Sequence, residues 1–464
     1  MTILTAVLLW LLFVALLAGV LRRLPWLPGV IVAAGLALLA IRLWTLPEAG
    51  TATMLGQTII LDESSNFLGF TLQLSLAARG AAELLLFWGI LFALATAWLN
   101  ADRALVPSIP LILAALILAL SSAPLLWAPL WLVIAAVLMA FPAQGSTPRL
   151  ARAALRTLLA PTLAFPFFLF TAWVLGQTTI AADDPALWVS GWRALVVGVL
   201  LLLTPVPLHG WITAQGEHAP PLTAAFLVGV WQITVYALIR HIFLEYATVA
   251  DYADPARWLP WLAVIQMGWG ALFSMSSTRL GQLWGYLLLW SYGATFLAWS
   301  ISGEFGTQTM VGLFLALPLA LILVAAGLQT INARFGENAK YADFHGVSER
   351  LPVATLAVVG GGLILLGWPL GALFPVRLAT FRLAETTQSL VFLWALLSLL
   401  LATVGLIRLL RALARPLSDP QLPRESSRLA WLILPLSLIG LILSLNPALL
   451  DPITARIADW LTLL

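Results

Sequence analysis

The side chains that could do chemistry in this chain are few, and each lies in or beside a long apolar run. Gln232 and Tyr236 are four residues apart, so in a helix they share one face with Arg240. Glu83 and Arg377 are isolated charges next to uncharged stretches. A charged or amide group inside a bilayer is costly without partners, so each of these residues is a functional candidate.

A polar stretch at residues 205–218, PVPLHGWITAQGEH, supplies another candidate, His209. Pro205 and Pro207 lack backbone donors, so they should break or bend a helix just before His209. A broken helix leaves free carbonyls, which membrane proteins tolerate beside a cavity. We expect His209 to close a span, and Glu217 and His218 to lie in a solvated loop.

Each candidate also has a plain structural interpretation. His209 could be a helix-end residue bonded to backbone, and Arg240 and His241 could reach towards lipid headgroups from the end of a span. Gln232 is the hardest to dismiss, because an amide in the middle of a span needs partners. No paired carboxylates, metal-ligand spacing or phosphate loop typical of a soluble enzyme is visible, and we expect no cofactor and no bound metal.

The elements that position these residues are membrane helices. The chain has 464 residues, a mean hydropathy of +1.01, 62% hydrophobic and 9% charged residues, and no cysteine, which excludes disulfide and thiolate-metal chemistry. Continuous apolar runs favour helices over a barrel. We expect an all-α polytopic membrane protein with about fourteen spans, at 2–21, 26–45, 80–99, 105–121, 124–142, 153–175, 188–209, 221–243, 258–276, 280–301, 308–328, 352–374, 387–412 and 429–449.

We expect residues 1–464 to form a single transmembrane domain, in which 120–250 and 258–412 are possible inverted-repeat units. The segment 55–74 is short, partly β-branched and amphipathic, which predicts a hairpin or surface segment outside the membrane. Residues Ile453–Leu464 could lie at the membrane interface.

Basic residues at odd-numbered connections predict the orientation, with those connections cytoplasmic and both termini on the outer face. They are Arg22, Arg23, Arg103, Arg149, Arg152, Arg156, Arg279, Arg334, Lys340, Arg350, Arg408, Arg411, Arg415, Arg424 and Arg428. The opposite connections carry the acids Asp183, Asp184, Glu245, Asp251, Asp254 and Glu304.

Three stretches together resemble the antiporter-like subunits of respiratory complex I, and most closely the M-type subunit of NADH-quinone oxidoreductase. The first is PVPLHGW at 205–211, followed by HAPP and a helix that ends YALIR at 236–240. The second is GALFSMSSTRLGQLWGY at 270–286, and the third is GWPLGALFPVR at 367–377. The resemblance covers nearly the whole chain and implies an antiporter-like fold with broken helices, no cofactor, other membrane subunits and lipid as partners, and no nucleic acid.

The resemblance also shows which family residues are missing. In the family, a glutamate on the fifth helix pairs with a lysine on the broken seventh, and further lysines pass a proton along the membrane midplane. The glutamate position aligns with Leu132, the seventh-helix lysine with Leu202 and the eighth-helix lysine with Gln232. Arg377 keeps a charge at the last position, but arginine does not give up its proton as lysine can. We therefore expect the usual proton channel to be lost or strongly altered.

Three functions remain open. The chain could be a membrane-arm subunit of a complex I-type assembly in a bacterial inner membrane, degenerate and mainly structural; any surviving proton path would run through His209, Gln232, Tyr236 and Arg377. It could belong to a related cation/proton antiporter, membrane-bound hydrogenase or inorganic-carbon uptake complex. It could also be an independent transporter that kept the scaffold.

Overall fold

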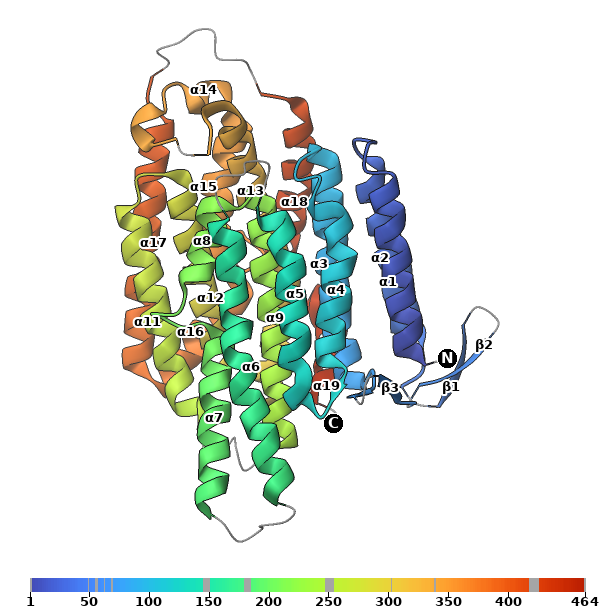
Figure 1. Cartoon of the computed structure of the whole chain (residues 1–464). Helices are drawn as coiled ribbons and strands as arrows, with labels where there is room; N and C mark the ends of the chain where they lie inside the picture. The colour runs from blue at the N-terminus through green and yellow to red at the C-terminus, as the bar shows by residue number, and fades with distance from the viewer. Residues whose placement is uncertain are drawn as a thin grey trace.

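The protein is a bundle of long helices, seen in a computed structural model (Figure 1) that describes residues 2–48, 50–54, 57–61, 63–67, 70–144, 151–178, 185–246, 254–301, 303–337, 339–416 and 425–462. The helices of the first half are α1 Ile3–Val20, α2 Leu27–Thr45, α3 Leu76–Leu99, α4 Leu105–Leu120, α5 Ala128–Ala143, α6 Arg152–Thr178, α7 Pro185–Leu203, α8 Gly210–His218 and α9 Pro221–Glu245. Those of the second half are α11 Pro255–Ser276, α12 Leu280–Trp299, α13 Gly303–Phe335, α14 Val347–Arg350, α15 Pro352–Leu366, α16 Phe374–Thr387, α17 Ser389–Leu413, α18 Ser427–Leu445 and α19 Asp451–Thr462.

Local sequence explains where several helices begin and end. Ser75 accepts a hydrogen bond from the Ala78 backbone N–H and so caps the start of α3. Asn100 ends the same helix in the left-handed conformation that asparagine tolerates, with φ of 50°. Prolines at the first helical position open α9 and α15, where no backbone donor is required.

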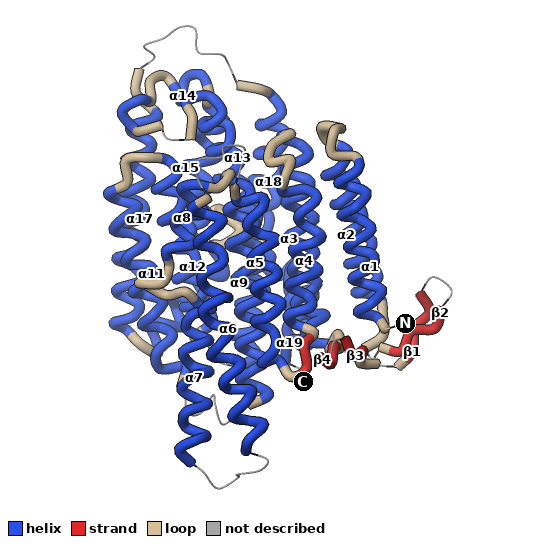
Figure 2. Tube along the Cα trace, in the orientation of Figure 1, coloured by secondary structure: helices blue, strands red, loops and turns tan. Residues whose placement is uncertain are grey.

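Strands are confined to one end of the bundle, beside both chain termini (Figure 2). β1 (Thr51–Met54) pairs antiparallel with β2 (Gln57–Ile60), and β3 (Ser65–Phe67) pairs with β4 (Phe70–Leu72). β4 also pairs with β5 (Ser122–Ala123) at the far end of α4. β2, β3 and β4 lie within the segment 55–74 and belong to hairpins, as the sequence predicts for that segment.

The helices in the centre of the bundle are apolar on all sides. The helices at its periphery are apolar on the surface that faces away from the bundle. The most hydrophobic stretches of α9 and α13 are fully buried, whereas α18 is mostly exposed. A helix surrounded by other helices, or one that faces lipid, has no need of a polar face. The fold is therefore that of an integral membrane protein, and α9 and α13 lie in its centre.

Two helices of the bundle are broken. The first break separates α7 from α8 at residues 204–209, and the second separates α15 from α16 at residues 367–373. α8 packs against α12 and α6. Gly216 and Gly285 allow its close approach to α12, because a Cβ on Gly216 would lie 2.2 Å from the Gly285 Cα.

The structure corrects the expected position of two segments. Residues 188–209 do not form one span that ends in a loop; α7 ends at Leu203, and Glu217 and His218 lie in α8, half-buried. The pair of prolines interrupts the helix, but the residues after Gly210 are good enough helix formers to start it again. Residues 352–374 also contain a break, because Gly367 ends α15 with φ of 89°.

Each of the fourteen predicted spans overlaps a helix. Within the described ranges, 10 helices are long and apolar enough to cross a membrane by length and composition, so the count of fourteen stays a prediction. Arg149, Asp183, Asp184, Asp251 and Arg424, which entered the orientation argument, lie outside the described residues.

Candidate functional site

Two tryptophan side chains donate hydrogen bonds to polar groups at the first helix break. The Trp231 indole N–H on α9 donates to the Leu202 carbonyl at 3.3 Å, and the Trp211 indole N–H on α8 donates to the Thr204 hydroxyl at 2.8 Å. The two indole rings contact each other edge to face, with centroids 5.8 Å apart. One carbonyl and one hydroxyl at the proline break are thereby bonded.

The side chains at this break are apolar where the resemblance implies a charged pair. Leu202 on α7 and Leu132 on α5 are both fully buried. Leucine can neither carry a proton nor act on a neighbouring group through a charge. The usual Glu–Lys switch therefore has no counterpart at these two positions.

His209 does not join the other candidate residues. It lies directly before α8, its carbonyl accepts from Ile212 N–H at 3.0 Å, and its ring lies 6.0 Å from that of Trp269. Its Nδ1 has no hydrogen-bond partner among the described residues. The bond to backbone fits the plain helix-end interpretation, and its role in a proton path stays a prediction.

Gln232 and Arg377 are connected by two hydroxyl residues of α12. The Thr295 hydroxyl donates to Gln232 Oε1 at 3.4 Å and to the Ser291 carbonyl at 3.0 Å. Arg377 Nη2 donates to the Ser291 hydroxyl at 3.4 Å. Thr295 and Ser291 are one helical turn apart, so they lie on one face of α12. We call these four residues, Gln232, Thr295, Ser291 and Arg377, the polar chain.

Arg377 ends this chain in the first turn of α16, directly after the second helix break. Its side chain is 1% exposed, and its guanidinium lies 5.6 Å from the centre of the Trp290 ring. Nε and Nη1 have no hydrogen-bond partner among the described residues. A buried guanidinium with two unbonded donors is costly, so this position is expected to hold water or another acceptor.

Tyr236 extends the site towards the end of the bundle where both termini lie. Its ring packs against those of Trp299 and Phe314, with centroids 5.1 and 5.7 Å away. A cavity of about 10 Å³, enough for about one water, touches both Gln232 and Tyr236. A larger cavity of about 250 Å³ touches Tyr236 and Arg240 on the other side of the tyrosine.

Neither of the two hydroxyl residues of α12, Ser291 and Thr295, was among the predicted site residues. The spacing was visible, since Ser291 and Thr295 are four apart like Gln232 and Tyr236. Which faces of α9 and α12 meet was not visible, because both helices are apolar all round.

A second cluster of polar side chains surrounds Asp102, in the loop between α3 and α4. The sequence did not predict this cluster. The Thr223 hydroxyl donates to its Oδ2 at 3.4 Å, and a cavity of about 420 Å³ also touches Gln329, Asn332 and Glu337. Burial raises the pKa of Asp102 to about 6, against the hydrogen bonds from Thr223. Asp102 thus lies beside the start of α9, the helix that carries Gln232.

Glu83 is a buried carboxyl outside the polar chain. It is 7% exposed, and its Oε1 has no hydrogen-bond partner among the described residues. Its neighbour Arg79 donates to the carbonyls of Leu43, Leu46 and Pro47. The Arg79 guanidinium also lies 4.6 Å from the centre of the Trp460 ring, which fastens α19 to the bundle.

No group of three or more His, Cys, Asp or Glu side chains that could hold a metal ion occurs within the described part of the chain. The polar chain is neutral apart from Arg377 and contains no nucleophile beside a base. Its arrangement suits hydrogen-bonded water and proton movement better than bond-making chemistry.

Solved structures of membrane complexes share this architecture. The chain superposes on a chain of the archaeal membrane-bound sulfane sulfur reductase with a TM-score of 0.77 at 16% identity, covering 99% of this chain and 98% of the other. The Mrp complex from Dietzia sp. gives a TM-score of 0.76 at 16% identity, over 100% and 98%. Respiratory complex I from Thermus thermophilus gives 0.70 at 20% identity, over 97% and 99%. The chain has the fold of an antiporter-like membrane subunit.

Curated relatives agree with the antiporter-like fold. NADH-quinone oxidoreductase subunit N of Gemmatimonas aurantiaca is 25% identical over 202 residues, which are 43% of this chain and 37% of the relative. Subunit N of Ectopseudomonas mendocina is 25% identical over 244 residues, 51% of this chain and 48% of the relative. The match thus spans less than half the length of these relatives. No family model matches the chain. The expected resemblance to antiporter-like subunits of complex I is confirmed.

Proposed function

We propose that the chain is a membrane-arm subunit of a complex I-type assembly, in which other subunits carry out electron transfer. The antiporter-like fold, the relatives named subunit N and the lack of a catalytic group in the polar chain support this assignment. Partners are then other membrane subunits and the lipid bilayer. Purification from native membranes should bring redox subunits with the chain, and a solitary protein would count against the assembly.

We infer that both termini face outward from a bacterial inner membrane. Figure 1 places the two chain ends at one end of the bundle, and Arg22, Arg103 and Arg428 lie in or beside turns at the other end. Positively charged connections face the cytoplasm as a rule. Protease or biotin-labelling of a tag at either end tests this orientation directly.

The standard proton relay is interrupted at the first break in this proposal. Leu132 and Leu202 supply neither the carboxylate nor the amine, and the polar backbone groups of the break are engaged by Trp231 and Trp211. The first break then has a structural role only, in a subunit that occupies the place of a pump module. Residues 120–250 and 258–412 are the proposed inverted-repeat units, and each contains one of the two breaks.

A candidate route remains through the polar chain, which runs from α9 across α12 to Arg377 beside the second break. The observation that carries this part is the pair of unbonded nitrogens of buried Arg377 at the end of the series from Gln232. Arginine holds its proton, so it would act as a fixed charge that orders water, and water would carry the proton. Tyr236 and the 250 Å³ cavity would then lead towards the outer face.

High-resolution density of the native assembly tests both parts at once. We expect ordered water between Gln232 and Arg377, and none beside Leu202. Liposomes that contain the purified assembly should then lose proton uptake when Arg377 is replaced by Met, and keep it when Leu202 is replaced by Met. A close-packed region around Arg377, with unchanged uptake in R377M, would leave the chain a purely structural subunit.

A second candidate function is favoured by the structural matches themselves. The sulfane sulfur reductase and the Mrp complex superpose on the chain with higher TM-scores than complex I. The chain could serve a related cation/proton antiporter or respiratory complex with the same membrane fold. The identity of the proteins that copurify, redox subunits or small antiporter subunits, separates the two assignments.

A further inference from the structure

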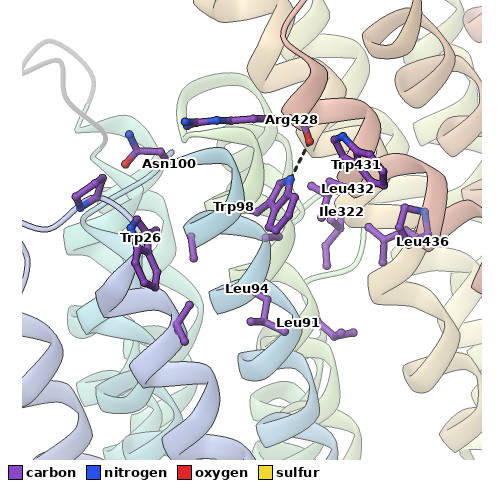
Figure 3. A pocket seen from close by; sticks show the side chains of 15 residues that line it. Trp26, Leu91, Leu94, Trp98, Asn100, Ile322, Arg428, Trp431, Leu432 and Leu436 are labelled. Atoms are coloured by element: carbon purple, nitrogen blue, oxygen red, sulfur yellow. Dashed lines mark hydrogen bonds between the residues drawn. The ribbon is translucent and has the colours of Figure 1, made fainter.

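A large cavity lies away from the polar chain, on the outer surface of the bundle. It is an apolar groove of about 810 Å³ between the α1–α2 turn, α3 and α18. Figure 3 shows its walls: Leu91, Leu94 and Trp98 of α3 face Leu432 and Leu436 of α18. Buried Ile322 of α13 also lines the groove. We call this feature the α3/α18 groove.

The two walls of the groove are joined at one end by a hydrogen bond. The Trp98 indole N–H donates to the Arg428 carbonyl at 2.8 Å, which ties α3 to the first turn of α18. Trp98 nevertheless remains 50% exposed, and Trp431 69% exposed. Tryptophan is favoured at the membrane–water boundary, so the groove begins at the boundary and runs into the hydrocarbon region.

The boundary end of the groove is positively charged. Arg428 lines it, and Figure 3 shows this side chain extended towards Asn100. The Arg103 guanidinium donates to the Asn100 side-chain oxygen at 3.3 Å, so a second positive charge lies at the same end. The neighbouring acid Asp102 is engaged by Thr223. No acidic side chain is found among the described residues that line the groove.

We propose that the α3/α18 groove binds an anionic phospholipid, with its phosphate at Arg428 and Arg103 and its acyl chains between α3 and α18. Charge complementarity selects this occupant: a basic end joined to a long apolar trough matches a negative headgroup joined to hydrocarbon. Basic pockets between membrane helices on the cytoplasmic side bind anionic headgroups by the same interactions. Arginine suits a phosphate oxygen pair because its donors form a planar fork.

Such a lipid would also have a structural role. α18 and the α1–α2 pair reach the rest of the bundle on either side of the groove, and the groove separates them at the boundary end. A bound lipid would fill this space and join the two edges of the subunit. This inference is independent of the polar chain and of proton movement.

Reconstitution with a defined lipid mixture tests the proposal. The purified chain, or its native assembly, is placed in nanodiscs of phosphatidylcholine with phosphatidylglycerol, re-extracted in mild detergent, and its retained lipids are counted by native mass spectrometry. We expect phosphatidylglycerol to be retained in preference to phosphatidylcholine. Arg428→Gln should lower that preference about fivefold, since one arginine near anionic lipid contributes about 1 kcal/mol.

Two further variants separate the groove from the general lipid-facing surface. Leu94→Trp should fill the trough and lower retention of both lipids. Leu356→Trp, at a residue of α15 that is 63% exposed and lies outside the groove, should change nothing. Equal retention of both lipids by the wild type, or the same retention by L94W and L356W, overturns the proposal.

A photo-crosslinking residue at position 98 in native membranes identifies the occupant directly. A lipid adduct is the expected product. A protein adduct would mean that a helix of a neighbouring subunit covers the groove, and it would overturn the lipid assignment. Neither result depends on whether the assembly moves protons.

Discussion

The two broken helices have opposite chemistry although they share one architecture. At the α7/α8 break, the Leu202 carbonyl and the Thr204 hydroxyl are each bonded to an indole, and the buried Leu202 side chain is apolar. At the α15/α16 break, Arg377 is buried with two unbonded nitrogens and contacts Ser291 of α12. At the first break the Leu202 carbonyl and the Thr204 hydroxyl are bonded, and the group left unbonded among the described residues is the His209 Nδ1. At the second break the unbonded donors belong to a buried positive charge.

This difference shows that a helix can be broken at a position where no transport site is present. A break needs residues that interrupt the helix and partners for the freed backbone groups. Proline and tryptophan supply both at the first break, so the geometry can persist after the charges have gone. A site also needs a polar group that is left available. Among the described residues of the two breaks, the His209 Nδ1 and the Arg377 Nε and Nη1 are unbonded, and of these two residues Arg377 is the one connected to the polar chain.

The largest expected effect comes from restoring a charge at the first break. Leu202→Lys should lower the free energy of unfolding by about 3–5 kcal/mol, because no anion lies there to pair with a buried ammonium group. Gln232→Lys, at the other family lysine position, should cost less, since Thr295 offers a hydroxyl. Denaturant unfolding of the detergent-solubilised protein measures both. Equal costs would mean that the two regions do not differ in polarity.

A smaller effect is expected from a substitution at Gly367, which lies against the Arg377 side chain. Gly367 has φ of 89°, and a Cβ there would lie 2.6 Å from the Arg377 Cγ. Gly367→Ala should therefore destabilise the protein by about 1–3 kcal/mol through backbone strain, and it should displace the arginine. It should also reduce proton uptake by the assembly, if the polar chain carries protons.

The matched control for this change is Gly268→Ala on α11, where an added Cβ meets nothing within 4 Å. Alanine in a helix is favoured over glycine by about 0.5–1 kcal/mol, so this variant should be slightly more stable. A loss of stability of similar size in both variants would contradict the special role of Gly367.

At the first break, removal of one indole donor should have a modest effect. Trp231→Phe keeps most of the ring and leaves the Leu202 carbonyl without its partner, which should cost about 1 kcal/mol. Proton uptake should not change, because this break lies outside the proposed route. Trp394→Phe, at an exposed tryptophan of α17, is the control and should be neutral. Lost uptake in W231F alone would return the first break to the transport path.

The sequence predicted the helices well because apolar runs of spanning length have few alternatives in a membrane. It predicted the first break from Pro205 and Pro207, but it placed the residues after His209 in a loop, since helix α8 is short and amphipathic signals are weak in this chain. The second break was missed altogether: Gly367 and Pro369 lie inside a continuous apolar run.

The candidate site was only partly predictable for a related reason. Gln232, Tyr236 and Arg377 stood out as polar residues in apolar surroundings, and the structure brings Gln232 and Arg377 to the two ends of one chain of contacts. His209 stood out in the same way, yet it lies apart from them. Hydrophobic periodicity cannot tell which faces of two uniformly apolar helices meet. The contact of Thr295 with Gln232 could therefore be recognised only from the structure.

The smallest expected effect concerns Asp102, which lies beside the start of α9. It tests whether a titratable group lies next to the helix that carries Gln232. Burial raises the pKa of Asp102 from 3.8 to about 6 in the folded protein, and Glu337 adds to the shift. The folded state thus binds this proton more tightly than the unfolded state, so the associated stability is present at low pH and is lost as the pH rises from 3.8 to about 6. The thermal midpoint of the wild type should fall across this window more than that of Asp102→Asn, in which an amide oxygen still accepts from Thr223. Parallel curves for the two proteins would show that Asp102 is an ordinary solvated loop carboxylate. Asp102 would then not be a proton-binding group at the start of α9.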